Sequence, residues 1–220
     1  MSLRRYTRAI PFNYTGYGMY RIGATSGIIP ATPINNGEIF QFRWNPANRS
    51  IIAIINRIRM SIAATTTQFA AGVPLSFSLT RASAWSVAGT VGAAITPAAL
   101  HKMDSAMPST ALADGDCRIA GTDAAGLGAG TKTLEGNFIG HAVIGQKITA
   151  ELDQHLAGPF DLFDSNVGNG GHPIILRAGA AAANAEGVVV RAIVPATGTW
   201  RASFEIEWAE STSYPFGASS

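Results

Sequence analysis

Charged residues are scarce in this 220-residue chain. They make up 14% of it, against roughly 25% in an ordinary soluble domain, whereas hydrophobic residues make up 47%. A surface with so few charges indicates that neighbouring molecules cover part of it.

The chain also lacks a disulfide framework, because Cys117 is its only cysteine. Its stability therefore has to come from packing or from assembly. No apolar run of signal-peptide length follows the basic start, and no stretch approaches the ~20 apolar residues of a membrane span. The sequence predicts a protein of cytoplasmic origin without a membrane partner.

Positive charge is concentrated at the start of the chain. Residues 1–60 hold eight arginines and one acid, Glu38, for a net charge of +7, while the remainder carries eight bases and thirteen acids, for −5. Arginine outnumbers lysine thirteen to three, and guanidinium groups suit fixed, partly desolvated contacts. This is either a solvated basic face or a part that docks on an acidic partner or an adjacent copy.

Alternation of apolar and polar residues predicts strands with one buried face. In "GEIFQFRWN" the aromatic residues point one way, with Gln41 and Arg43 opposite, and "PLSFSLTRA" alternates in the same way. The run "SIIAIINRIRMSIA" also fits a helical stripe, but its β-branched residues favour a strand. Further strands are predicted at "LEGNFIGHAVIG" and "HPIILRAG".

Other stretches have the composition of loops. Residues 1–33 are rich in Tyr, Gly, Arg and Pro without a clear period, which predicts an extended arm or irregular lead-in. Residues 88–131 are rich in Gly, Ala, Thr and Ser, and "DQHLAGPFDLFDSNVGNGG" is typical of a broad loop.

The end of the chain predicts a hairpin. "EGVVVRAIV" and "TWRASFEIEW" are strands joined by residues 195–198, and a register with Val190 opposite Phe204 makes one side wholly apolar. That register brings Arg191 within reach of Glu205. The polar face of the second strand holds Arg201, Ser203, Glu205 and Glu207.

These segments predict an all-β protein, an antiparallel β-sandwich or jelly-roll with long Gly/Ala-rich loops and an extended N-terminal arm. We expect an arm at 1–33 and a single sandwich domain at 34–220, with a long loop region around 88–131. The predicted core scaffold consists of Phe40, Phe42, Trp44, Trp200, Phe204, Ile206 and Trp208.

No catalytic, metal or cofactor site is predicted. The histidines, at positions 101, 141, 155 and 172, lack zinc spacing, and Cys117 has no nearby partner. "GLGAGTKT" superficially resembles a phosphate loop, but Thr131 precedes Lys132 where a Walker-type motif needs glycine.

Two binding alternatives remain weaker than their simpler explanations. The loop "DLFDSNVGNGG" offers Asp161, Asp164, Asn166 and Asn169 to a calcium ion, but it lacks the spacing and closing glutamate of an EF-hand, and such residues also favour turns. "RRYTR" and "FRWNPANR" could face nucleic acid, yet the modest charge and interleaved core aromatics favour a protein contact.

"HPIILRAG…EGVVVRAIVPATGTWRASFEIEWAE" resembles a family of tailed-bacteriophage and prophage virion structural proteins. The resemblance extends to "GEIFQFRWNPANRSIIAIINRIRMSI", "FAAG", "SFSLTRASAWSV" and "CRIAGTDAAGLGAGTKTLEG", and so spans about residues 34 to 210. Its motifs are strands and turns and carry no active-site signature. The chain departs from the family at "RAGAAAANAEG", and its N-terminal arm matches less well.

The resemblance implies a β-sandwich component of the virion that is not an enzyme. We expect a capsid decoration or cement protein that binds the major capsid protein or other virion proteins as a homo-oligomer, a trimer by analogy. The alternative is a tail- or fibre-associated protein that binds a receptor or carbohydrate through loop aromatics such as Trp85 and Tyr214. The predicted docking residues are Arg4, Arg5, Tyr6, Arg8, Arg57 and Arg59.

Overall fold

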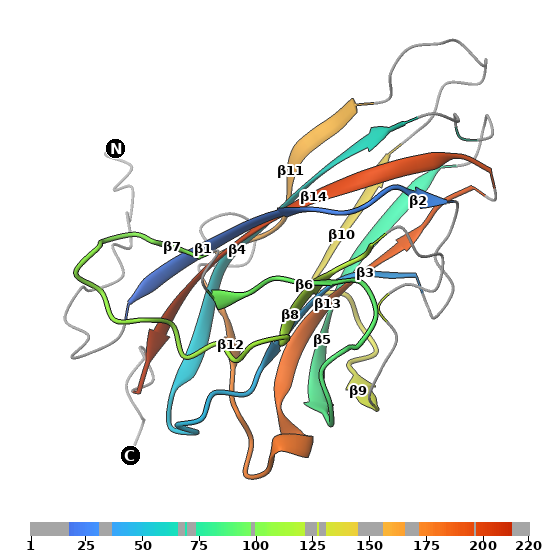
Figure 1. Cartoon of the computed structure of the whole chain (residues 1–220). Helices are drawn as coiled ribbons and strands as arrows, with labels where there is room; N and C mark the ends of the chain where they lie inside the picture. Colours follow the sequence, from blue (N-terminus) through green and yellow to red (C-terminus); the bar gives the residue numbers. More distant parts are fainter. Residues whose placement is uncertain are drawn as a thin grey trace, which may run out of the picture.

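The protein is described by a computed structural model that places residues 18–30, 37–65, 69, 74–97, 100–121, 127, 131–144, 156–165, 172–195 and 197–212. These residues form two antiparallel β-sheets, and their helical structure is limited to 3-10 turns such as η2 (Ala182–Asn184). The sheets pack against each other as two layers (Figure 1). The predicted all-β antiparallel sandwich is confirmed.

The first sheet, sheet A, contains the longest strands. Its order is β11 (Leu156–Asp164), β4 (Ile52–Ala64), β14 (Thr199–Ser211), β1 (Met19–Thr25) and β7 (His101–Lys102). Two short strands add to it: β2 (Ile29–Pro30) pairs with β14, and β12 (Ile174–Leu176) pairs with β4. The ambiguous isoleucine-rich run is thus a strand, β4, as expected.

The second sheet, sheet B, has the order β10 (Gly140–Ile144), β5 (Leu75–Trp85), β13 (Glu186–Ile193), β3 (Glu38–Trp44), β8 (Cys117–Ile119) and β6 (Ala93–Ala94). A short strand, β9 (Lys132–Leu134), pairs with the end of β5. The strands predicted within "GEIFQFRWN", "PLSFSLTRA" and "LEGNFIGHAVIG" lie in this sheet as β3, β5 and β10.

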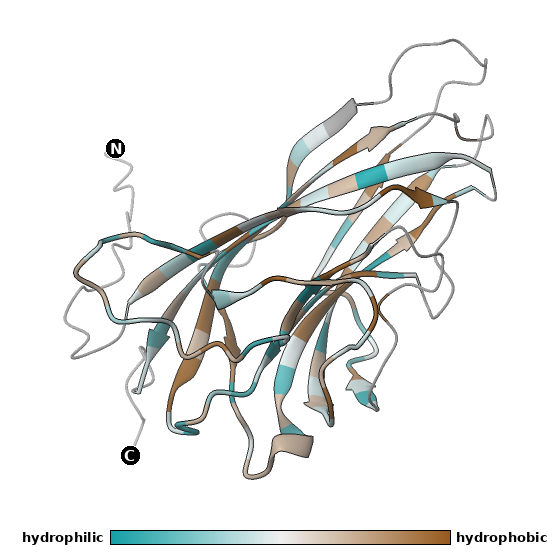
Figure 2. Ribbon diagram, viewed as in Figure 1, coloured by the Kyte–Doolittle hydropathy of each residue, from teal (hydrophilic) through white to brown (hydrophobic). Residues whose placement is uncertain are grey.

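Aromatic side chains join the two sheets through the core. Phe40 of β3 stacks on Phe204 of β14 with ring centroids 4.8 Å apart, and Phe42 meets Trp208 edge-on at 5.2 Å. Hydrophobic and hydrophilic residues alternate along the strands (Figure 2). The seven predicted core side chains are all buried: Phe40, Phe42, Trp44, Trp200, Phe204, Ile206 and Trp208.

The predicted hairpin between the last two strands is wrong. β13 pairs with β3 and β5 in sheet B, whereas β14 pairs with β1 and β4 in sheet A. Both edges of each strand are paired with other strands, so the chain passes from sheet B to sheet A between β13 and β14. The two apolar faces still share one core, but they meet across it. Consequently Arg191 lies beside Glu38, with 3.9 Å between Nη2 and Oε1, and has no register with Glu205.

Two segments predicted as irregular are strands. Residues 19–25 and 29–30, placed in the arm by the sequence, form β1 and β2, because Tyr20 and Ile22 alternate into the core. Residues 156–164, predicted as part of a loop, form β11 at the edge of sheet A. Two register shifts against β4 interrupt its alternation.

The segment predicted as a long loop around 88–131 is mostly irregular where the structure describes it. It carries only the short strands β6, β7 and β8, and passes from β7 in sheet A to β8 in sheet B (Figure 1). Arg118 fixes its early part by donating Nε to the carbonyl of Val91 at 3.0 Å and Nη2 to that of Gly92 at 3.0 Å.

Candidate functional site

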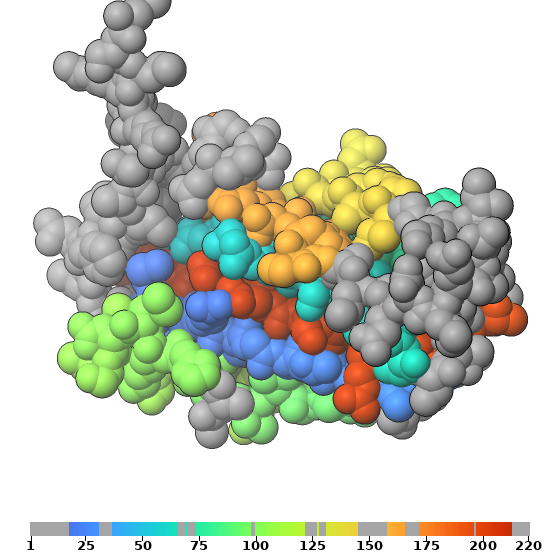
Figure 3. All heavy atoms as spheres, turned by 90° about the horizontal axis from the view of Figure 1, so that it is seen from above, coloured from blue at the N-terminus to red at the C-terminus, as the bar shows by residue number. Residues whose placement is uncertain are grey.

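The outer face of sheet A carries a regular pattern of opposite charges. We use the name charged face for the seven residues of this pattern that form ion pairs with one another: Arg21, Arg57, Arg59, Asp161, Asp164, Glu205 and Glu207. They come from β1, β4, β11 and β14, which lie side by side on one face of the molecule (Figure 3).

The strand register arranges these side chains in two rows across the sheet. One row runs through Asp164, Arg57, Glu207 and Arg21, and the signs alternate at every step. The second row runs through Asp161, Arg59, Glu205 and then Gly23. Direct cross-strand neighbours of opposite charge are favourable in both rows.

The rows are joined by ion pairs. Asp161 accepts hydrogen bonds from Nε of Arg57 at 2.9 Å and from Nε of Arg59 at 2.8 Å. Arg57 also lies 3.6 Å from Asp164, measured from Nε to Oδ2. On the other side, Arg21 binds Glu205 and lies 3.8 Å from Glu207.

Partial burial perturbs the acid–base behaviour of this face. The pKa of Glu207 is raised, chiefly because burial disfavours its charged form, although Arg21 acts against this. A hydrogen bond to Glu205 raises the pKa of Arg21. The side chains keep between 12% and 41% of their surface exposed, so another molecule can reach them.

The outer face of sheet B instead exposes apolar side chains. Val143 of β10 and Ile193 of β13 lie opposite Ser76 of β5, one on each side, and are 58% and 67% exposed. Nearby, exposed Phe138 stacks on His141, whose ring hydrogen-bonds Ser76 at 2.8 Å. We call Val143, Ile193 and Phe138 the apolar row.

Farther along sheet B, loops cover a buried polar network that the sequence did not predict. Glu38, 3% exposed, binds Lys132 at 2.5 Å and Gln41 at 2.5 Å. Lys132 also lies over the ring of Trp85, 4.7 Å from its centroid. Alternation in the sequence showed only that Gln41 points away from the core. Such a pattern carries no information about which residues cover the outward face of the strand.

Arg43 anchors a second part of this network. Its Nη1 donates to Asp116 at 2.9 Å, and its remaining donors reach the carbonyls of Trp85, Ser86 and Ala182. Burial raises the pKa of Asp116, and Arg43 opposes that rise. A guanidinium so enclosed is not available to nucleic acid.

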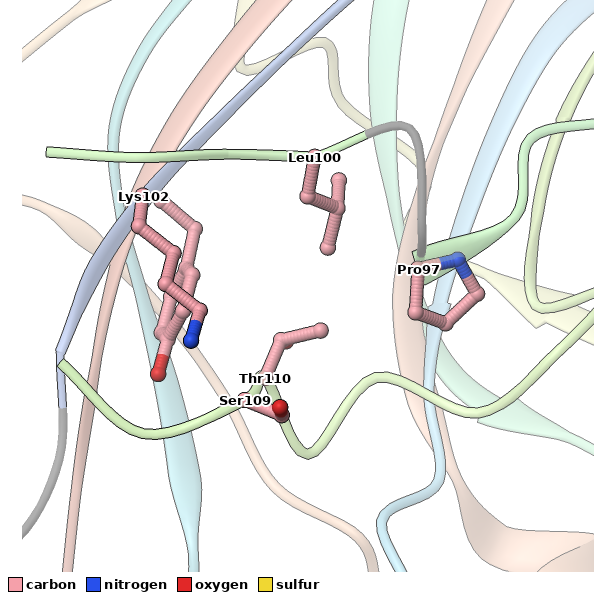
Figure 4. Close-up of a pocket in the computed structure, with 6 residues that line it drawn as sticks. Pro97, Leu100, Lys102, Ser109 and Thr110 are labelled. Atoms are coloured by element: carbon pink, nitrogen blue, oxygen red, sulfur yellow. The ribbon is translucent and has the colours of Figure 1, made fainter. Parts of the chain in front are cut away.

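A small cavity lies under the segment that carries β7. Its volume is about 170 Å³, and it is lined by Tyr20, Pro97, Leu100, Lys102, Ser109 and Thr110 (Figure 4). Lys102 lies on the side opposite Pro97 in Figure 4, and its Nζ donates to the carbonyl of Met107 at 2.8 Å. The cavity is therefore mixed in polarity, and its one ammonium group already has a hydrogen-bond acceptor.

Glu210 is buried beside this cavity at the end of β14. Its carboxylate accepts hydrogen bonds from the hydroxyl of Thr110, the backbone N–H of Ala111 at 2.9 Å and the indole N–H of Trp208 at 3.1 Å. Burial nevertheless raises its pKa. Burial and the charge of Glu210 together raise the pKa of Tyr20 to about 12.

The predicted docking residues fall into two groups. Arg4, Arg5, Tyr6 and Arg8 lie outside the described residues, so their role stays a prediction. Arg57 and Arg59 lie together on the charged face, where each already contacts Asp161. They belong to an array in which three arginines are interleaved with four acids, and not to a basic patch.

The alternative sites predicted from the sequence are weakened where the structure describes them. Asp161 is engaged by two arginines, which disfavours a calcium ion there, while Asn166 and Asn169 lie outside the described residues. Lys132 of the glycine-rich stretch binds Glu38. Trp85 is fully buried and cannot stack on a sugar, and Tyr214 lies outside the described residues.

Comparisons with protein-family models, with curated proteins and with solved structures find no match to this chain. In the described ranges no group of three or more His, Cys, Asp or Glu side chains is placed to hold a metal ion. No helix in that part of the chain is long and apolar enough to cross a membrane. The resemblance to phage virion proteins therefore stays a prediction.

Proposed function

We propose that this chain is a non-enzymatic structural protein of a tailed-phage virion, and that it binds the head shell as a decoration or cement protein. The resemblance described above motivates the class of protein. Its mechanism is the addition of buried area between shell subunits, repeated over many copies.

The apolar row on sheet B is the observation that carries this proposal. Val143 and Ile193 stand in register on a rigid sheet, with Phe138 nearby, and all three are more than half exposed. Exposed apolar side chains gathered on one face are typical of a protein–protein contact. Strand residues lose little conformational freedom on binding, which favours a permanent contact.

Labelling of intact particles tests the proposal. Particles produced by the phage that encodes the chain are purified, and the protein is located by immunogold electron microscopy. Label spread over the head supports a decoration protein. Label confined to the tail supports the tail- or fibre-associated alternative, and label absent from particles overturns virion membership.

A matched pair of variants tests the apolar row itself. Ile193→Asp places a charge in the row, and we expect about tenfold fewer copies per particle by quantitative mass spectrometry. Val87→Asp makes the same change at a similarly exposed valine beyond the opposite end of β5 and should leave the copy number unchanged. Equal occupancy of both variants would show that the row does not contact the shell.

A further inference from the structure

We propose that the charged face of sheet A binds a second copy of this chain about a twofold axis that runs parallel to the strands, between β4 and β14. This inference concerns the protein alone and does not depend on a virion. It accounts for the acids that surround Arg57 and Arg59, which a basic docking patch would not explain.

Self-complementary charge is the first reason. Rotation about that axis reverses the order of the strands and preserves each row. The first row of one copy then faces the first row of the second copy in reverse order. Asp164 meets Arg21 of the second copy, and Arg57 meets Glu207 of the second copy. In a twofold interface each such contact occurs twice.

The second row obeys the same rule. Arg59 meets Glu205 of the second copy, and Asp161 meets Gly23, which has no side chain. No charged residue of either row faces a like charge. Complementarity of this kind fixes register and excludes other partners.

Other orientations of the same two faces are repulsive. A twofold axis perpendicular to the strands exchanges the rows and keeps the strand order. Asp164 would then face Asp161, Arg57 would face Arg59, and Glu207 would face Glu205. Like charges held opposite each other in this way repel, so the charge pattern selects the axis parallel to the strands.

The size of the face is sufficient for a stable pair. The four strands have 7, 13, 13 and 9 residues in β1, β4, β14 and β11, and at a spacing of about 4.8 Å they cover roughly 670 Å². Specific interfaces bury about 600–1,000 Å² on each partner. Sheets stack face to face with their strands within about 30° of each other, which the parallel axis satisfies.

The side chains are also of the right kind. Arginine is enriched at protein interfaces, because its planar group keeps several donors available after the first ion pair. Arg21 and Arg59 are 41% and 33% exposed, so they can reach a second carboxylate without leaving the first. Partial exposure also limits the cost of desolvating these charges.

Analytical ultracentrifugation of the purified full chain tests the proposal. We expect a species of twice 22.9 kDa at ~0.05 M salt, with a dimer about tenfold weaker at ~0.5 M salt because exposed charges are screened. A protein that is monomeric at ~100 µM and low salt overturns the proposal. A species of three copies also overturns it, because a twofold face closes as a pair.

Two charge reversals identify the surface. Arg59→Glu and Glu205→Arg each place like charges opposite each other twice, and each alone should weaken the dimer by about 100-fold. Mixing the two variants restores opposite charges at both contacts, so a heterodimer should form. Recovery on mixing also shows that both variants are folded, and failure to recover overturns the proposed axis.

Arg201→Glu is the matched control. Arg201 lies on the same face, but the axis places it opposite Ala63, so its reversal should leave dimerisation unchanged. An effect as large as that of Arg59→Glu overturns the proposed axis. Because every readout uses the protein alone, failure here leaves the proposed virion function standing.

Discussion

Arg43 and Asp116 form an ion pair that is almost completely enclosed by the protein. Their Nη1 and Oδ1 atoms are 2.9 Å apart, and the two side chains are only 6% and 3% exposed. Arg43 comes from β3, and Asp116 precedes β8 in the long irregular segment. The pair thus fastens that segment to sheet B.

Removal of one partner should be strongly destabilising. Asp116→Ala leaves the Arg43 guanidinium buried without a counter-charge, and we expect the free energy of unfolding to fall by about 3–5 kcal/mol. Urea denaturation measures this loss. Asp161→Ala removes an acid from the partly exposed charged face and should cost less than about 1 kcal/mol. Similar losses in the two variants would show that Asp116 is solvated.

Alternation in the sequence predicted most strands and the buried side of each. It succeeded where an unbroken run of alternating residues gives a strand one apolar face, as in β3, β5 and β14. It failed at β11, because the pairing of β11 with β4 shifts register between Ala157 and Phe160 and again between Asp161 and Phe163. These shifts break the period of two. It also missed β1, a short strand whose side-chain pattern is interrupted at Gly23.

Which strands are neighbours was harder to predict than which residues are buried. The apolar strand faces that contain Val190 and Phe204 can be buried in two ways. The two strands can form a hairpin with one apolar side, or they can lie in two layers that meet across a core. The sequence analysis predicted the hairpin, whereas in the structure the two strands belong to different sheets. The charged face was missed for the same reason, because it is assembled from four strands whose order the sequence does not state.

Gly140 lies where β10 approaches the edge of sheet A. A Cβ atom at this position would overlap the carbonyl oxygen of Leu162 in β11, which is backbone and cannot rotate away. Gly140→Ala should therefore lower the free energy of unfolding by about 1–3 kcal/mol in urea denaturation. Gly136→Ala, with nothing within 4 Å of its added atom, is the matched control. Equal stability of the two variants contradicts the close approach.

Cys117 should resist thiol reagents while the protein is folded. Its side chain is fully buried, and burial together with the charge of Asp116 raises the pKa of its thiol. We expect a colorimetric thiol reagent to label it only at the rate of unfolding, and at once in denaturant. Ser105→Cys adds a thiol at an exposed position and should react immediately in the folded protein. Fast labelling of the unmodified protein would contradict the burial of Cys117.

Glu210 should make stability depend on pH in an unusual direction. Its folded-state pKa is raised above the ordinary 4.5, so the folded protein holds the proton more tightly than the unfolded chain. The resulting stabilisation is fully present below about pH 4.5 and is lost as the pH rises through the raised pKa. We expect the free energy of unfolding to decrease over this range, and to decrease less steeply in Glu210→Gln. Equal slopes in the two proteins would show that burial does not shift this carboxyl.

A variant of its hydrogen-bond donor should move the same profile the other way. The hydroxyl of Thr110 stabilises the ionised form of Glu210 and lowers its pKa against the effect of burial. Thr110→Val keeps the shape and removes that donor, so the pKa of Glu210 rises further. The loss of stability should then be steeper than in the unmodified protein and extend to higher pH, as measured by urea denaturation across pH. Opposite changes in Glu210→Gln and Thr110→Val assign the titration to this carboxyl, because a general weakening of the segment would lower stability equally at every pH.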